Sequence, residues 1–81
     1  MGMFGTCEIS DGNDRVVAKG HDGNDDQPST LQVNVVEDNG LQKGAVYKLT
    51  LPDGTGYRGI SYTGNDGDTC YDFHYQDADR F

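Results

Sequence analysis

The chain of 81 residues has no tryptophan, only two prolines and two cysteines, and six basic residues against fourteen acidic ones. Hydrophobic residues make up 33% of it, and no apolar run approaches the roughly 20 residues of a membrane-spanning helix. Apolar residues do not recur at helical spacing, and twelve glycines interrupt any such pattern. These absences argue against a membrane-spanning protein and against a helical bundle.

The shortage of basic residues leaves a net charge of −8. This charge disfavours nucleic-acid phosphates and anionic membranes as partners, because like charges repel. It suits solubility, a basic protein surface or a hard cation. The length predicts a single domain over residues 1–81, with a small and marginal core, and residues 1–3 resemble an expression start.

Two-residue alternation, bounded by Gly, Asn, Asp and Pro, is the pattern that the sequence does contain. It predicts strands at 6–10, 15–19, 30–37, 45–51, 56–63 and 70–76. We expect the core to receive Leu31, Val33 and Val35 from one strand and Tyr71, Phe73 and Tyr75 from another. Residues 20–29 are polar and are predicted to form a flexible loop. The expected fold is all-β: a small antiparallel β-sandwich or barrel of five to six short strands.

The two cysteines, Cys7 and Cys70, lie near opposite ends of the chain. A disulfide between them would close a loop of about sixty residues and stabilise the domain by roughly 4 kcal/mol. For so small a core we predict this bridge, and with it an oxidising, secreted environment. The alternative is two free thiols in a cytosolic protein, one of them a small buried apolar residue.

Calcium is the metal that the abundant Asp and Asn suggest. The densest cluster comprises Asp22, Asn24, Asp25 and Asp26, and the tripeptide Gly-Asn-Asp occurs three times in the chain. The pattern of an EF-hand is absent, and the same residues are those that tight turns select. We therefore expect turns and no cofactor, with a calcium site as the alternative.

Catalytic signatures are absent from the sequence. It has no GxSxG, HExxH, CxxC or phosphate-binding glycine loop. We predict that the protein is not an enzyme.

Two surfaces are candidates for contact with a partner. Arg58 and Tyr62 would form a recognition patch if both faced solvent, because Tyr and Arg are enriched in binding hot spots. Val33 and Val35 belong to a segment that could accept a partner's strand if it lay at a sheet edge, or that could be a central strand. A flat row of exposed aromatic side chains would instead indicate sugar binding.

The layout resembles the ToxB-like (MAX) effectors secreted by plant-pathogenic fungi. The matching pieces are Cys7–Ser10 as first strand, 45–51 and 57–63 as third and fourth, and Cys70 just before a strand at 71–75. The resemblance implies a secreted virulence protein that binds a host protein, and we expect the protein to be a monomer. A small acidic cytosolic inhibitor of phage or mobile-element origin, or a calcium- or carbohydrate-binding module, is the alternative.

Overall fold

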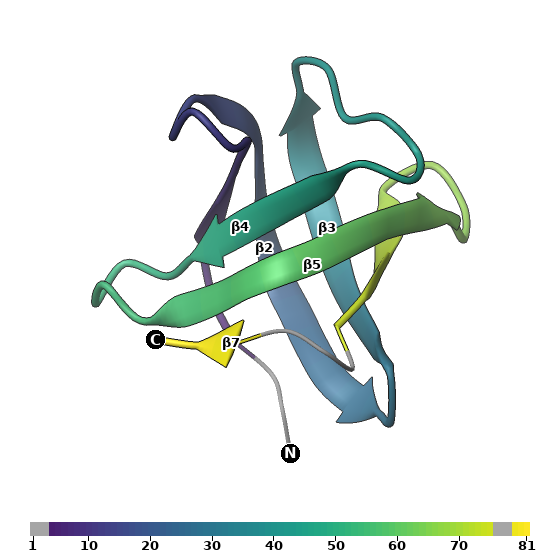
Figure 1. The fold of residues 1–81 in the computed structure, drawn as a ribbon. Helices are drawn as coiled ribbons and strands as arrows, with labels where there is room; N and C mark the ends of the chain where they lie inside the picture. Colours follow the sequence, from purple (N-terminus) through teal and green to yellow (C-terminus); the bar gives the residue numbers. More distant parts are fainter. Residues whose placement is uncertain (1–3, 76–78) are drawn as a thin grey trace.

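The computed structural model describes residues 4–75 and 79–81, without the side chain of Asp26. The described chain is all strand and turn, as predicted (Figure 1). Its strands are β1 (Cys7–Ser10), β2 (Val16–Gln27), β3 (Thr30–Asp38), β4 (Val46–Thr50), β5 (Gly56–Asn65), β6 (Cys70–His74) and β7 (Asp79–Arg80). Each of the six predicted strands is present, and none of the described residues form a helix able to cross a membrane.

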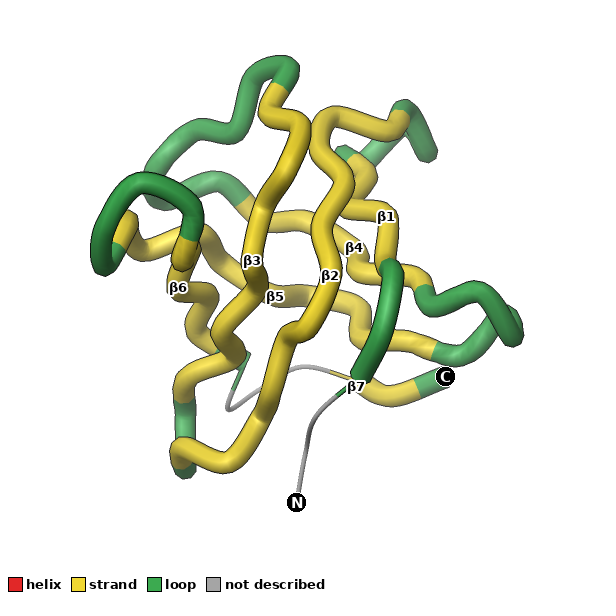
Figure 2. Tube along the Cα trace, turned by 180° about the vertical axis from the view of Figure 1, so that it is seen from behind, coloured by secondary structure: helices red, strands yellow, loops and turns green. Residues whose placement is uncertain are grey.

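Six of the strands pair in a closed antiparallel ring. Their order is β4-β1-β2-β3-β6-β5, and the pairing of β5 with β4 completes the ring. The short β7 extends the sheet beside the first half of β5, where Arg80 pairs with Tyr57 and Asp79 with Arg58. Figures 1 and 2 show β4 and β5 crossing over β2 and β3, so that the two groups of strands enclose the core between them.

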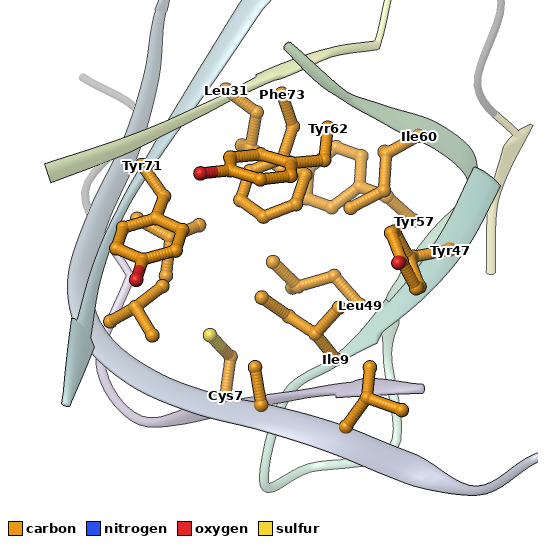
Figure 3. Close-up of a cluster of buried hydrophobic side chains, with 14 residues drawn as sticks. Cys7, Ile9, Leu31, Tyr47, Leu49, Tyr57, Ile60, Tyr62, Tyr71 and Phe73 are labelled. Carbon is orange, nitrogen blue, oxygen red and sulfur yellow. The ribbon is translucent and has the colours of Figure 1, made fainter. Parts of the chain in front are cut away.

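The core is built by alternation of side chains along the strands, because successive residues of a strand point to opposite faces. Fourteen hydrophobic residues are buried: Cys7, Ile9, Val17, Ala18, Leu31, Val33, Val35, Tyr47, Leu49, Tyr57, Ile60, Tyr62, Tyr71 and Phe73 (Figure 3). Leu31, Val33 and Val35 lie on the inner face as predicted, and so do Tyr71 and Phe73. Tyr75 packs partly buried against the same cluster.

Residues 20–29 were expected to form a loop, and this prediction is wrong. Strand β2 continues to Gln27 and pairs with β3 throughout, although its register shifts three times. The polar residues are accommodated because the shifts break the regular alternation. Asp22, at φ 53°, adopts the left-handed conformation within the irregular stretch.

The predicted disulfide between Cys7 and Cys70 is also wrong, since both cysteines are free. Cys7 pairs with Gly20 on β2, and Cys70 pairs with Asn34 on β3, so β1 and β6 are three strand positions apart. In the closed ring of six strands this places β1 and β6 on opposite sides of the core, whereas a disulfide requires Cα atoms within about 7 Å. Cys7 also points inward, whereas Cys70 precedes the inward-pointing Tyr71 and therefore lies on the outer face.

Candidate binding groove

The structure separates the predicted partner-binding residues. Tyr62 is 8% exposed and stacks on Tyr71 inside the ring, so it forms no surface patch with Arg58. Val33 and Val35 are buried on β3, which pairs with β2 on one side and β6 on the other. This strand is therefore central where the two valines lie, and of the four residues only Arg58 is exposed.

The predicted calcium ligands lie on a bulged strand. The carboxylate of Asp25 accepts hydrogen bonds from Tyr57 and Arg80, and that of Asp22 contacts His21. The side chain of Asp26 lies outside the described part of the chain. Within that part, no three side chains of His, Cys, Asp or Glu come together as a metal site.

The interior provides no polar site. Every buried polar side-chain atom among the described residues has a hydrogen-bond partner. Hydrophobic side chains occupy the space between the strands (Figure 3).

A groove of about 430 Å³ opens on the outer surface between the β1–β2 turn and strands β4 and β5. Its lining consists of Asp11, Gly12, Asp14, Val46, Tyr47, Lys48, Arg58 and Gly59. A second hollow of about 350 Å³ shares Asp11, Val46 and Tyr47 with it and adds Arg15 on the far side. Val46, 59% exposed, therefore stands between two hollows that together include three basic residues.

A β-bulge at Gly59 determines which way Arg58 faces. Tyr47 pairs with Ile60 and Lys48 with Arg58, so Gly59 is an extra residue on β5, and it has a φ of 87°. Glycine adopts this left-handed conformation without steric cost. The extra residue allows Tyr57 and Ile60 both to point inward while Arg58 points outward into the groove.

The positive charges of the groove lie at one cross-strand pair. Lys48 and Arg58 occupy directly opposed positions, and Nζ of Lys48 donates a hydrogen bond of 2.7 Å to Oδ1 of Asp14. This hydrogen bond lowers the pKa of Asp14, and the positive charges of Lys48 and Arg58 lower it further. Both cations therefore stabilise the negative charge of the Asp14 carboxylate.

The C-terminus supports Arg58 from its other side. The guanidinium carbon of Arg58 lies 5.1 Å from the ring centroid of Phe81, within the range of a cation–π contact. Phe81 is held in turn by two backbone hydrogen bonds to Gly56, of 2.9 and 3.1 Å. Its neighbour Arg80 donates a hydrogen bond of 3.0 Å to Asp25. The far end of the chain thus fixes one wall of the groove.

Sequence reasoning identified Arg58 but not the other residues of the groove. Lys48 could have been placed opposite Arg58 by counting back from the predicted hairpin turn, because the bulge at Gly59 shifts only the pairs that follow Arg58. Asp14 gave no signal, because it reaches Lys48 across 34 positions of sequence.

Comparison of the chain with protein-family models, curated proteins and solved structures found no match. Its function is therefore argued from the geometry of its own surface.

Proposed function

We propose that this chain is a non-catalytic binding protein that recognises a protein partner through the outer face of β4 and β5, around the groove. The observation that carries the proposal is the position of Val46, an exposed aliphatic residue between two hollows and close to Lys48 and Arg58. Arginine is enriched in binding hot spots, and removing the exposed aliphatic surface of Val46 from water would add to the affinity for a partner.

A contrast with Val36 supports the choice of this face. Val36 is 62% exposed, about as much as Val46, but it lies on β3, three strands from β4 in either direction around the ring. It lines neither of the two hollows beside Val46. Single exposed aliphatic residues are ordinary on protein surfaces, whereas a concave setting with adjacent cations provides complementarity to a partner.

Two more specific forms of this function are hypotheses about origin and compartment. One is a secreted fungal effector that binds a host protein, and the other is a small acidic inhibitor from a phage or mobile element. The free cysteines favour the second form, because unpaired thiols persist in reducing compartments. A calcium- or carbohydrate-binding module has less support, because no three side chains of His, Cys, Asp or Glu come together among the described residues, and Tyr57, Tyr62, Tyr71 and Phe73 are buried.

The test is a selection of binders from a library of random peptides, followed by mapping on the isotope-labelled protein by nuclear magnetic resonance. We expect enriched peptides to shift the backbone amide signals of residues 45–48 and 58–59. Val46→Ser should weaken their binding by about tenfold, since burying an aliphatic side chain contributes roughly 1.5 kcal/mol.

Val36→Ser is the matched control, with the same chemical change at the same exposure on the opposite side of the ring. It should leave peptide affinity unchanged. Signals that move on β3 and β6 instead, or equal losses of affinity in the two variants, would place binding elsewhere and contradict the proposal.

A further inference from the structure

Two of the six basic side chains in this strongly acidic protein, Lys48 and Arg58, lie opposite each other on adjacent strands. Like charges at opposed positions of an antiparallel pair repel each other and destabilise the pairing. The pair therefore favours an anion beside it. In this structure the anion is the carboxylate of Asp14, which belongs to the turn between β1 and β2.

The turn itself does not need the carboxylate of Asp14. The carboxylate of Asp11 accepts the hydrogen bonds from the backbone N–H groups of Asn13 and Arg15 and so stabilises the turn. The side chain of Asp14 is 80% exposed, and Lys48 is the partner of its carboxylate in a hydrogen bond. An exposed ion pair of this kind contributes little to stability, so an external carboxylate can replace it.

Arg58 has donors to offer such a carboxylate. Among the described residues its guanidinium makes no ion pair, although it lies over the ring of Phe81. A guanidinium carries five N–H donors in one plane, more than a single contact with an aromatic ring can occupy. A carboxylate can accept two of these donors at once.

We propose that the groove binds an aspartate or glutamate side chain of a partner segment, which displaces Asp14 from Lys48 and is held by Lys48 and Arg58 together. An apolar residue next to the bound acid contacts Val46. We specify a side chain and not a chain terminus because the resident anion is itself the side chain of a turn residue. This inference rests on the proposed function and adds the chemistry that the face recognises.

The experiment titrates the labelled protein with two blocked peptides, acetyl-Val-Asp-Gly-Val-amide and its Asn counterpart, and follows the amide signals of residues 45–48 and 58–59. We expect the Asp peptide to bind at least tenfold more tightly than the Asn peptide, as charge-assisted hydrogen bonds of about 1.5 kcal/mol imply. Lys48→Gln and Arg58→Gln should each remove most of this preference, whereas Lys19→Gln, an exposed change on β2, should preserve it.

The Asp14→Asn variant gives the sharpest result, because it removes the resident competitor and leaves both cations in place. We expect it to bind the Asp peptide severalfold more tightly than the wild type does. Unchanged or weaker binding in this variant would overturn the displacement of Asp14. Equal affinities for the Asp and Asn peptides, or no shift at the groove with either, would overturn recognition of an acid. The proposed function fails separately, if peptides from the random library bind elsewhere.

Discussion

At each end of the closed sheet a tyrosine hydroxyl donates a hydrogen bond to an aspartate, but the two aspartates differ in how far away in the sequence their partners lie. At the end near β7, Asp25 accepts hydrogen bonds from Tyr57 at 2.5 Å and from Arg80 at 3.0 Å. These partners are 32 and 55 positions away in the sequence. The Asp25 side chain is 12% exposed, so this long-range contact is largely shielded from water.

At the other end, Asp38 binds mostly its own neighbourhood. It accepts hydrogen bonds from the backbone N–H groups of Gly40 and Leu41 and, across the sheet, from the hydroxyl of Tyr71 at 2.9 Å. Asp38 is exposed, and two of its three contacts lie within three residues of it. A local contact of this kind can form without the rest of the fold, whereas the Asp25 contact requires β2, β5 and β7 to be in place together.

Each of the two hydrogen bonds raises the pKa of the tyrosine that donates it. Burial, together with the hydrogen bond to Asp25, raises the pKa of Tyr57 to about 12. The pKa of Tyr71 is also raised, chiefly by its hydrogen bond to Asp38. Both hydroxyls therefore stay protonated as donors at neutral pH. The Asp25 contact also connects the C-terminus to the groove, since Arg80 precedes Phe81, whose ring lies under the guanidinium carbon of Arg58.

The largest effect on stability is expected from Asp25→Ala, which removes the hydrogen bonds from Tyr57 and Arg80. Removing the acceptor leaves the hydroxyl of Tyr57 unpaired, and we expect a loss of about 2–3 kcal/mol in the free energy of unfolding. Chemical denaturation measures it. Hydrogen exchange at the amides of Gly56 and Phe81 should also accelerate, because β7 loses its side-chain anchor.

Asp68→Ala is the control for this change. It removes an exposed carboxylate from the β5–β6 turn and should alter the free energy of unfolding by less than about 0.5 kcal/mol. If Asp25→Ala cost no more than a change at Asp38, the long-range contact would not be the stronger of the two.

A smaller effect is expected from Asp38→Asn at the local end. Asn retains an acceptor for Gly40 and Leu41 but offers none to Tyr71, so the loss should be about 0.5–1 kcal/mol at neutral pH. Burial tends to raise the pKa of Asp38, but the hydrogen bonds from Gly40, Leu41 and Tyr71 outweigh it and lower the pKa below 3.8.

The sign of the pH dependence follows from this shift. A carboxyl group with a lowered pKa in the folded state stabilises the protein above its unfolded pKa, and that stabilisation is lost as the pH falls through the folded value. The difference in free energy of unfolding between wild type and Asp38→Asn should therefore be constant above about pH 5 and shrink below pH 3.8. A difference that grew on acidification would contradict this account.

Alternation bounded by turn residues located the six strands of the ring, although it ended the second at residue 19 and did not predict β7. It did not reveal β-bulges, because a bulge is an interruption of the very pattern that identifies a strand. Gly20 and Gly23 were interpreted as loop residues, yet they lie within β2 where a side chain would collide with Val33 and Phe4. The sequence alone does not distinguish a glycine that permits close packing from a glycine that permits a turn.

The disulfide, in contrast, could have been rejected from the sequence. The same alternation that directed Tyr71 and Phe73 into the core directs Cys70 to the outer face, whereas Cys7 shares the inner face of β1 with Ile9. Two side chains on opposite faces of a closed sheet cannot be joined. The groove could not be predicted from the sequence, because it depends on the bulge at Gly59 and on Asp14, which is distant in sequence from β4 and β5.

The smallest effect on stability is expected from Cys70→Ser, a change on the outer face that should alter the free energy of unfolding by less than about 0.5 kcal/mol.

The reactivity of the two thiols should differ, because Cys7 points into the core and Cys70 lies on the outer face. Burial raises the pKa of Cys7 to about 11, so its reactive thiolate is scarce as well as shielded. Burial and the nearby Asp72 also raise the pKa of Cys70, but that residue is only half-buried. Alkylation of the folded protein without reductant should therefore add one label, at Cys70, and denaturation should admit a second, at Cys7. Intact mass measures both stages. Resistance of both cysteines after denaturation, relieved only by reductant, would mean that they are joined, and the ring could not then have the register described for β1 and β6.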